Sequence, residues 1–466
     1  MSTIYDVTVI GAGVVGSAIA RALAGFELKV LLVDARNDIG DGTSKANTAI
    51  LHTGFDASPG TVESRLVHRG YELLRDYCAQ AAIPLQNTSA LLVAWDQEQL
   101  DSLPTLQTKA EKNGYPHTEI VSAEQVYATA PELGAGALGG LVVPGESIIC
   151  PWSTTLAFAT EALQRGAELR LNTEVRTAII ESDYTILTTN SGTIQTRWVV
   201  NAAGLGGDKI EALFGFERFE LHPRRGELLV FDKLAAPKAP VILLPVPSKL
   251  GKGVLISPTI YGNVMLGPTA EDMTDRADTS TTEAGFAFLR SKGEVLMPSL
   301  LNEEVTAAYA GLRAAHDQSD YVIQADAATR YLVAGCIRST GLTSSMAVAE
   351  YVVELLDDAG LELAERTGLP PTPTVPPIGE YQLRPYADAD KIAADPAYGT
   401  VVCFCERVSA GEIRDALTAE IPATDLGGLR RRTRAHNGRC QGFFCGARLT
   451  ALLNQAADDT KAEARR

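Results

Sequence analysis

The stretch that decides the fold lies at residues 4–34 and reads IYDVTVIGAGVVGSAIARALAGFELKVLLVD. A short apolar run ends on glycines, a helical pattern follows, and a second apolar run ends in the acid Asp34. Gly11 makes the tight turn, Gly13 lets the backbone approach a pyrophosphate, and Gly16 lets helix and strand pack closely. The helix N-terminus offers N–H donors to phosphates, and Asp34 can accept ribose hydroxyls. We therefore predict a dinucleotide site of the Rossmann type.

A second glycine pattern, GAGALG at residues 134–139, follows the segment APEL rather than a strand, and it leads into a strand-like run. Because the required strand-then-helix context is missing, we interpret this pattern as a loop. It therefore offers no second dinucleotide site. The spacing of the first site alone does not distinguish FAD from NAD.

Length and charge limit the possible functions. The chain has 466 residues, 45% of them hydrophobic, which suits two or three domains. Its 41 basic and 57 acidic residues give a net charge of −16, which argues against sequence-independent nucleic-acid binding but allows a small anionic substrate. No run approaches the roughly 20 apolar residues of a transmembrane segment. The N-terminus has no signal-peptide pattern, so we expect a cytoplasmic protein.

The chain divides into a large body and a small C-terminal domain. We expect an α/β and α+β fold, in which a Rossmann-type lobe carries an inserted antiparallel-sheet substrate lobe, mainly at about residues 80–150 and 217–335. The run PPTPTVPP favours an extended linker after the body. The boundaries that we predict are residues 1–369 for the body, 370–399 for the proline-rich linker, 400–456 for a helical cysteine domain and 457–466 for a charged tail.

Four of the seven cysteines crowd the C-terminal domain. Cys403 and Cys405 form a C-x-C pair, and Cys440 and Cys445 form a C-x-x-x-x-C pair. In a cytoplasmic chain such a group is more often a metal or redox site than a disulfide framework. Four thiolates suffice for a 2Fe–2S cluster, whereas structural zinc and a domain without metal are the alternatives.

Two local patterns accompany the cysteines. The segment SAGE at residues 409–412 is a capping box and predicts that a helix starts just after the first pair. Positive charge ahead of the second pair would offset an anionic cluster. This charge comes from Arg430, Arg431, Arg432, Arg434 and Arg439.

Four segments of the body resemble, in the correct chain order, motifs of the D-amino-acid-oxidase superfamily of FAD enzymes. They are GTSKANTAILHTGFD after Asp34, NAAG at 201–204, RGE at 225–227 and IRSTGLT at 337–343. The resemblance implies that FAD is the cofactor and that a helix begins over its flavin ring, where the helix dipole would stabilise the reduced anion. The residues that it places along FAD, beyond the first glycine turn, are Thr43, Ser44, Lys45, Ala203, Gly204, Gly341, Leu342 and Thr343.

The same resemblance names candidates for the chemistry. His52 lies in the loop that the family places near the flavin, where it could be the base or could merely pack against the cofactor. Arg313 falls where related dehydrogenases hold an arginine for the anionic end of the substrate, and Arg338 is a second candidate to orient that group. The alternative for Arg313 is a salt bridge between lobes. Lys252 and His316 are weaker candidates.

Two further likenesses bear on the activity. The segments SPGTVESRLVHRG, GPTAED and GLRAAHDQSDYVI are similar to anaerobic glycerol-3-phosphate dehydrogenases and L-2-hydroxyglutarate oxidases. The run RRTRAHNGRCQGFFC resembles the 2Fe–2S domain of bacterioferritin-associated ferredoxin. Together they imply a dehydrogenase for an anionic secondary alcohol, first of all glycerol 3-phosphate, and that electrons leave through the cluster.

The external acceptor implied is a carrier protein or a quinone-linked subunit, which would place the protein at the inner face of the membrane through that partner. An L-2-hydroxy-acid or amine dehydrogenase is the alternative, and a non-catalytic redox module is a third hypothesis. The turn CIRSTGLTSS departs from the Gly-Gly-Lys-Leu-Thr-type turn of the anaerobic enzymes, which leaves the identity of the acid open.

Overall fold

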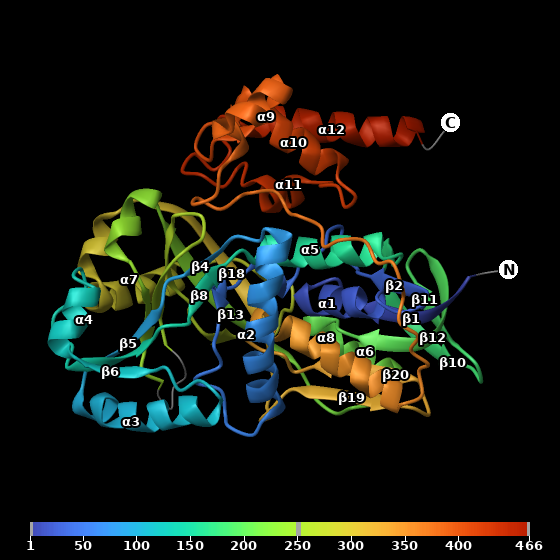
Figure 1. Cartoon of the computed structure of the whole chain (residues 1–466), viewed down its shortest axis with the longest axis horizontal. Helices are drawn as coiled ribbons and strands as arrows, with labels where there is room; N and C mark the ends of the chain where they lie inside the picture. The colour runs from blue at the N-terminus through green and yellow to red at the C-terminus, as the bar shows by residue number, and fades with distance from the viewer. Residues whose placement is uncertain (1–2, 248–252, 464–466) are drawn as a thin grey trace.

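The computed structural model describes residues 3–247 and 253–463, and it has three parts (Figure 1). A lobe built on a largely parallel sheet lies beside a second lobe built on a largely antiparallel sheet. The cysteine domain, drawn in orange and red, lies across the top of both. Within these ranges no helix has the length and apolar character needed to cross a membrane.

The first lobe confirms the predicted Rossmann-type unit. Its central strand, β1 (Ile4–Ile10), runs parallel to β12 (Gly192–Asn201) on one side and to β2 (Val30–Val33) on the other. β1 and β2 are almost wholly buried, which explains their continuous apolar sequence. The remaining strands of this sheet are β9 (Glu168–Arg170), β10 (Val175–Ile180), β11 (Thr185–Thr189), β19 (Val322–Asp326) and β20 (Tyr331–Gly335).

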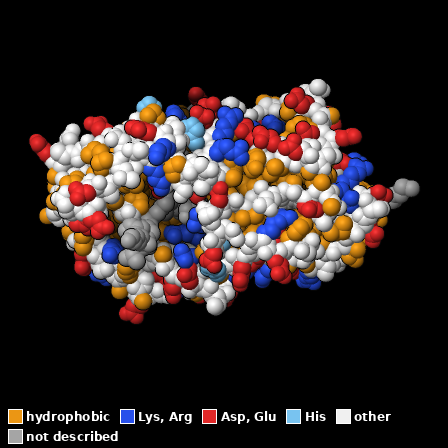
Figure 2. Space-filling view, turned by 90° about the horizontal axis from the view of Figure 1, so that it is seen from below, with side chains coloured by type: hydrophobic (Ala, Val, Ile, Leu, Met, Phe, Trp, Pro, Cys, Tyr) orange, Lys and Arg blue, Asp and Glu red, His pale blue; other side chains and the backbone are white. Residues whose placement is uncertain are grey.

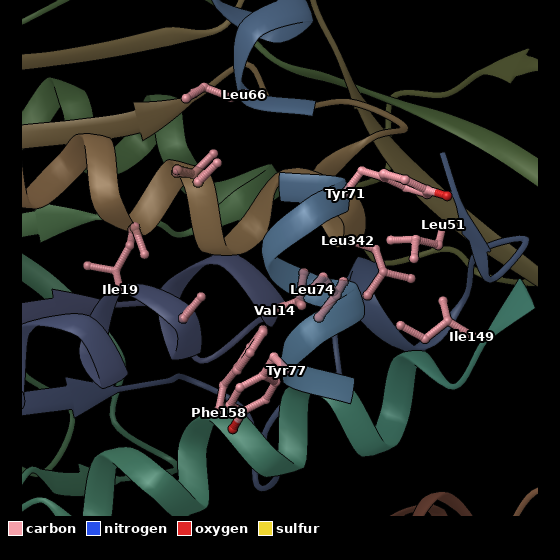
Figure 3. Close-up of a cluster of buried hydrophobic side chains, with 14 of the residues drawn as sticks. Val14, Ile19, Leu51, Leu66, Tyr71, Leu74, Tyr77, Ile149, Phe158 and Leu342 are labelled. Carbon is pink, nitrogen blue, oxygen red and sulfur yellow. The ribbon is translucent and has the colours of Figure 1, made fainter. Parts of the chain in front are cut away.

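Four helices pack against one another beside this sheet. α1 (Val14–Leu23) packs against both α5 (Pro151–Gln164) and α8 (Gly341–Asp358), and α2 (Val62–Ala81) packs against α8. Figure 3 shows their side chains meeting, with the rings of Tyr77 and Phe158 5.1 Å apart. The short helix α6 (Gly207–Leu213) follows β12.

The second lobe confirms the predicted inserted sheet. All its neighbouring strands are antiparallel except β5 and β14, which run parallel. In sheet order the strands are β17 (Glu271–Asp272), β13 (His222–Phe231), β16 (Val264–Gly267), β15 (Leu255–Pro258), β14 (Ile242–Pro245), β5 (Ala90–Ala94), β7 (Gly139–Val143) and β6 (Glu119–Ser122), with β18 (Val305–Ala315) also paired to β13. The lobe's helices are α3 (Gln97–Lys112), α4 (Ala123–Thr129) and α7 (Glu283–Leu296).

Smaller elements join the lobes. A three-stranded sheet contains β3 (Ile50–Leu51), β8 (Ser147–Ile149) and β4 (Leu85–Asn87), so it brings the loop after β2 next to the entry of the second lobe. The glycine pattern at residues 134–139 forms a turn that leads into β7, as predicted. A short 3₁₀ helix at Thr43–Lys45 lies between β2 and β3.

The cysteine domain is small and mainly helical. β21 (Val401–Cys403) pairs with β22 (Val408–Ser409), and α10 (Ala410–Thr418), α11 (Leu426–Thr433) and α12 (Gly446–Glu463) follow. The predicted capping box is present at the start of α10. α12 runs on through Glu463, so most of the stretch predicted as a charged tail is helical. The run PPTPTVPP forms no helix or strand, and α9 (Ala389–Ala394) lies beyond it, within the predicted linker at 370–399.

Candidate active site and iron–sulfur centre

The glycine turn after β1 is closed by sterics that only glycine satisfies. Gly11 has φ +108°, and a Cβ atom there would lie 2.4 Å from the carbonyl oxygen of Ala202. A Cβ on Gly16 would lie 1.8 Å from the carbonyl oxygen of Gly11. The second predicted segment, Ala203–Gly204, therefore begins directly against the first turn. The two turns form a cradle of backbone at the N-terminus of α1, which fits a pyrophosphate.

The carboxylate of Asp34 binds the backbone of this turn. It accepts hydrogen bonds from the backbone N–H groups of Ala12 (2.7 Å) and Arg36 (2.8 Å). Burial raises the pKa of Asp34 despite these two donors. Each carboxylate oxygen retains a lone pair, so a ribose hydroxyl can still donate to it.

The three residues of the 3₁₀ segment Thr43–Lys45 were all predicted to lie along FAD, but each makes a different contact. The Ser44 hydroxyl accepts a hydrogen bond from the N–H of Val14 at 3.0 Å, so it lies at the start of α1. Thr43 donates to the carbonyl of Leu312 in β18 (2.8 Å), and Lys45 forms an ion pair with Asp41 (2.9 Å). Only Ser44 thus touches the glycine turn, while Thr43 ties this loop to the second lobe.

His52 is held by a carboxylate that the sequence did not point to. Its Nδ1 atom lies 2.9 Å from one oxygen of Glu146, a residue with 0% exposure. The other oxygen of Glu146 accepts from the N–H (2.6 Å) and the hydroxyl (2.9 Å) of Thr53. A carboxylate at Nδ1 favours the tautomer with its proton there, which leaves the Nε2 lone pair free to accept a proton. Glu146 lies 94 positions from His52, so no local pattern could reveal it.

The start of α8 meets both the histidine loop and α1. The backbone N–H of His52 donates to the Thr343 hydroxyl at 3.0 Å. A Cβ on Gly341 would lie 2.9 Å from Ile337 and 3.8 Å from Val15 in α1. Leu342 packs into the core beside α2 (Figure 3). The N-termini of α1 and α8 therefore lie side by side, next to the cradle and the His52 loop.

Arg313 is a half-buried cation in β18. It follows Leu312, whose carbonyl holds the Thr43 loop, and it lies opposite Arg224 in β13. Burial, and then the charge of Arg224, hold the pKa of Arg313 below its usual value. Among the residues that the structure describes, Arg313 forms no ion pair, so the alternative of a salt bridge between lobes finds no support there.

The other candidates are less enclosed. Arg338 is exposed and lies 3.8 Å from Glu63. His316 is buried, with Nε2 2.9 Å from the carbonyl oxygen of Cys336. Burial and then the charge of Arg338 lower the pKa of His316. Lys252 lies outside the described residues.

The four predicted cluster ligands come together in two pairs. The Cys405 thiol contacts Cys440, and the Cys445 thiol contacts Cys403. Two thiolates on each side are what a binuclear 2Fe–2S cluster with four cysteine ligands requires. In the described ranges no group of three or more His, Cys, Asp or Glu side chains is arranged around a single metal ion.

Two of these thiols have pKa values that are shifted in opposite directions. Burial, and then the neighbouring Cys403, raise the pKa of Cys445 to about 11. Burial opposes ionisation of Cys440 too, but the backbone N–H of Phe444 and the Cys405 thiol hold its pKa below the usual value. Cluster binding must displace these thiol protons, so assembly of the centre is coupled to proton release.

The arginines near the second cysteine pair mostly hold the domain in place. Asp38, only 1% exposed, accepts from Arg431 (2.6 Å) and from Arg432 (2.7 and 2.8 Å). Arg439 pairs with Asp232 of the second lobe at 2.9 Å. These guanidinium groups were predicted to offset cluster charge, but their direct partners are acids of the body. The sequence did not indicate Asp38.

Arg434 links the cluster loop to the loop at Thr43–Lys45. It pairs with Glu406 (3.2 Å), the neighbour of Cys405, and its guanidinium lies 4.1 Å from the ring centroid of Tyr261. Tyr261 stacks on Trp152 at 5.1 Å, and the Trp152 indole donates to the carbonyl of Lys45 (3.0 Å). A continuous packed contact therefore joins the two predicted cofactor sites.

Comparisons with known families identify both parts of the chain. Residues 6–355 match the family described as FAD dependent oxidoreductase, and residues 401–455 match the BFD-like [2Fe-2S] binding domain. The chain belongs to the FAD-dependent oxidoreductase family. FAD and a 2Fe–2S cluster are its cofactors, which fits the glycine cradle and the paired thiols.

Individual relatives cover both domains. The chain is 35% identical to a glycerol 3-phosphate dehydrogenase of Caloramator mitchellensis over 96% of this chain and 94% of that protein. It is 27% identical to one subunit of the anaerobic glycerol-3-phosphate dehydrogenase of Escherichia coli K12, over 98% of this chain and 89% of the relative. Among solved structures, the dithionite-reduced L-alpha-glycerophosphate oxidase of Mycoplasma pneumoniae with FAD bound superposes with a TM-score of 0.76 at 27% identity. That match covers 80% of this chain and 99% of the oxidase.

Proposed function

We propose that this oxidoreductase converts sn-glycerol 3-phosphate to dihydroxyacetone phosphate and passes the electrons through its 2Fe–2S cluster to an external acceptor. The observation that carries the proposal is the likeness to the C. mitchellensis dehydrogenase over nearly the whole of both chains, cysteine domain included. The FAD-bound glycerophosphate oxidase supports the same substrate for the body alone. An attached one-electron centre favours a dehydrogenase over an oxidase that feeds oxygen.

Arg313 and His52 divide the work on the substrate. Arg313, half-buried and without an ion-pair partner among the described residues, binds the phosphate in bidentate fashion. His52 accepts the hydroxyl proton at Nε2, because Glu146 occupies Nδ1. FAD, when bound, supplies a hydride acceptor at N5. Loss of that hydride from carbon and of the proton from oxygen converts the alcohol to the ketone.

The remaining site residues hold the cofactors. The cradle of Gly11, Gly13, Gly16, Ala203 and Gly204 would hold the pyrophosphate, with Ser44 at its edge and Asp34 toward the ribose. The N-terminus of α8, at Gly341–Thr343, would face the flavin, and its dipole would stabilise the reduced anion. Cys403, Cys405, Cys440 and Cys445 ligate the cluster. Arg338, at the surface, guides the anion rather than binding it tightly.

An electron-accepting partner completes the proposal. The E. coli relative is by name one component of a larger enzyme, which supports a partner protein here too. We place the protein in the cytoplasm, where its acceptor is a carrier protein or a quinone-linked partner at the membrane.

The test is anaerobic titration of protein that holds one FAD and one cluster per chain. Glycerol 3-phosphate is added while the visible spectrum is recorded. Rapid flavin bleaching followed by cluster reduction supports the proposal. A fully loaded protein that stays oxidised contradicts glycerol 3-phosphate as the substrate. Bleaching by L-2-hydroxyglutarate or an amino acid would then identify the alternative, and no bleaching by any of them indicates a non-catalytic redox module.

A further inference from the structure

The cysteine loops carry the three most exposed large hydrophobic side chains that the structure describes. They are Phe443 (84% exposed), Phe444 (75%) and Phe404 (73%). Phe404 stands between Cys403 and Cys405, and Phe444 immediately precedes Cys445. The rings of Phe443 and Phe444 meet edge to face, 5.2 Å between centroids. Isolated exposed apolar residues are common, but three rings gathered on the ligand loops of one redox centre are not.

Ligation of the cluster does not explain these rings. The thiols bind iron through sulfur, and the domain's own core is filled by other residues, among them Val408, Leu429 and Leu449. Phenylalanine in water loses the hydrophobic stabilisation that burial would give it, so a surface of this kind favours a bound protein. Because the rings are attached to the ligand loops, a protein that covers them also comes close to the cluster.

One exposed arginine lies just after the loop that carries two of the rings. Arg448, in the first turn of α12, is exposed and forms no ion pair with any side chain that the structure describes. Arg439, beside Cys440, is half exposed, but its charge is offset by Asp232 at 2.9 Å and by Glu304 at 3.9 Å. The whole chain, in contrast, carries a net charge of −16. On the face opposite the cysteine domain, acidic and basic side chains are interspersed (Figure 2).

We propose that Phe404, Phe443, Phe444 and Arg448 form a phenylalanine surface where an acidic one-electron carrier protein docks. The rings supply the apolar centre of the interface, and Arg448 at the rim attracts an acidic partner. Each substrate molecule yields two electrons, so two carriers dock in turn and each leaves reduced by one electron. The inference rests on the proposed function only in that the cluster passes electrons outward.

The experiment compares two haem carriers of opposite charge, acidic cytochrome b5 and basic cytochrome c, with ferricyanide as a small acceptor. The holoenzyme is reduced with stoichiometric dithionite and mixed with each acceptor in a stopped-flow instrument. This design tests docking even if glycerol 3-phosphate is not the substrate. We expect cytochrome b5 to react faster than cytochrome c, and salt to slow its reaction.

The Phe443→Ser, Phe444→Ser double variant is expected to slow cytochrome b5 reduction at least about tenfold, with ferricyanide reduction unchanged. Phe288→Ser is the matched control, because Phe288 is 44% exposed on α7, outside the cysteine domain, and this change is expected to leave every rate as it was. Iron content and the visible spectrum establish that the double variant retains its cluster.

A charge reversal keeps the rings and tests the rim alone. Arg448→Glu is expected to slow cytochrome b5 and to speed cytochrome c, a crossover that a merely structural defect would not produce. If the cytochrome b5 and cytochrome c rates are the same in the wild type, in the double serine variant and in Arg448→Glu, while the cluster is intact, the proposed docking surface is wrong. If the wild type sediments as a dimer that the double variant abolishes, a second copy covers the rings, and the carrier is wrong as occupant.

Discussion

The glycine cradle and the cysteine loops both serve a cofactor, but different forces shape them. In the cradle, backbone meets backbone so closely that a Cβ at Gly11 or Gly16 would overlap its neighbour. In the cysteine loops the thiols lie against one another in pairs and beside backbone N–H groups, and the rings next to them are exposed. Backbone sterics therefore shape the cradle, whereas the cysteine site needs iron to join its two pairs of thiols.

The same contrast extends to function. In the proposed function the body holds the substrate chemistry, while the domain relays electrons that it cannot generate. Changes in one part are thus expected to leave a recognisable half-reaction in the other, and the following variants test that separation.

Cys440→Ser is expected to have the largest effect, because one iron loses a ligand and the cluster does not assemble. Iron analysis should find none, and electron delivery to protein acceptors should stop, while substrate still bleaches the flavin. Cys78→Ala is the control, because that buried thiol lies in α2 of the body, and iron content should stay unchanged. A Cys440→Ser protein whose flavin is no longer bleached by substrate would contradict the expectation that the body reacts independently of the cluster.

His52→Ala tests the opposite half. Removal of a general base typically lowers the rate by about 10²–10⁴-fold, so substrate-driven flavin bleaching is expected to slow by that factor. Dithionite should still reduce the cluster at the wild-type rate. Glu146→Gln, which keeps the imidazole but removes its carboxylate partner, is expected to have a smaller effect in the same direction. His117→Gln, at an exposed histidine, controls for loss of a ring, and an equal loss there would contradict the role of His52.

Asp38→Ala tests how the two parts are joined. It leaves Arg431 and Arg432 without their buried partner, a change that typically costs about 3–5 kcal/mol. Faster cleavage of residues 370–399 by a protease would report release of the cysteine domain. The control, Asp395→Ala, removes an exposed pair with Arg414, and such a pair contributes about 0–1 kcal/mol.

The titration of Asp38 gives the same contact a pH dependence. Burial opposes ionisation, but Arg432 and Arg431 hold the pKa of Asp38 below its usual value. A depressed folded-state pKa stabilises the contact above the unfolded value of about 3.9, and the contribution is lost as pH falls through the lower folded value. Protease release of the domain in the wild type is therefore expected only below about pH 4, and release at pH 6 would contradict the assignment.

Gly11→Ala is expected to have the smallest effect on folding but a clear one on FAD. A positive φ and the overlap with Ala202 strain the turn by about 1–3 kcal/mol, which weakens the cradle. Fluorescence of released flavin measures the loss of FAD affinity. Gly360→Ala separates backbone strain from steric overlap. Gly360 also has a positive φ, but no atom lies within 4 Å of its Cβ position. Equal losses of FAD in both variants would show that the cradle is not what holds the cofactor.

Local patterns predicted what local forces decide. The turn at Gly11–Gly16 and the capping box at Ser409–Glu412 are set by residues within a few positions of each other, and both are present as predicted. The orientation of Thr43 was not predictable in this way, since the carbonyl of Leu312 in β18, 269 positions away, decides it.

Contacts between distant segments left no signal in the sequence. Glu146 lies in a short turn after β7 with nothing to mark it as the partner of His52. Asp38 lies shortly after the dinucleotide motif. Its partner Arg432 is 394 positions away in the sequence. Only packing of the finished molecule brings such groups together, so the family resemblance gave the histidine but not its carboxylate.

The loop from Asp38 to Gly40 contacts both the glycine cradle and the cysteine domain. Asp38 binds the arginines of α11, and two residues later the N–H of Gly40 donates to the carbonyl of Ala12 in the glycine cradle at 2.8 Å. Binding at one end that orders this loop favours binding at the other, and the coupling free energy is the same in both directions. Protein made under iron starvation is therefore expected to hold FAD less tightly, and protein stripped of FAD to lose its iron sooner.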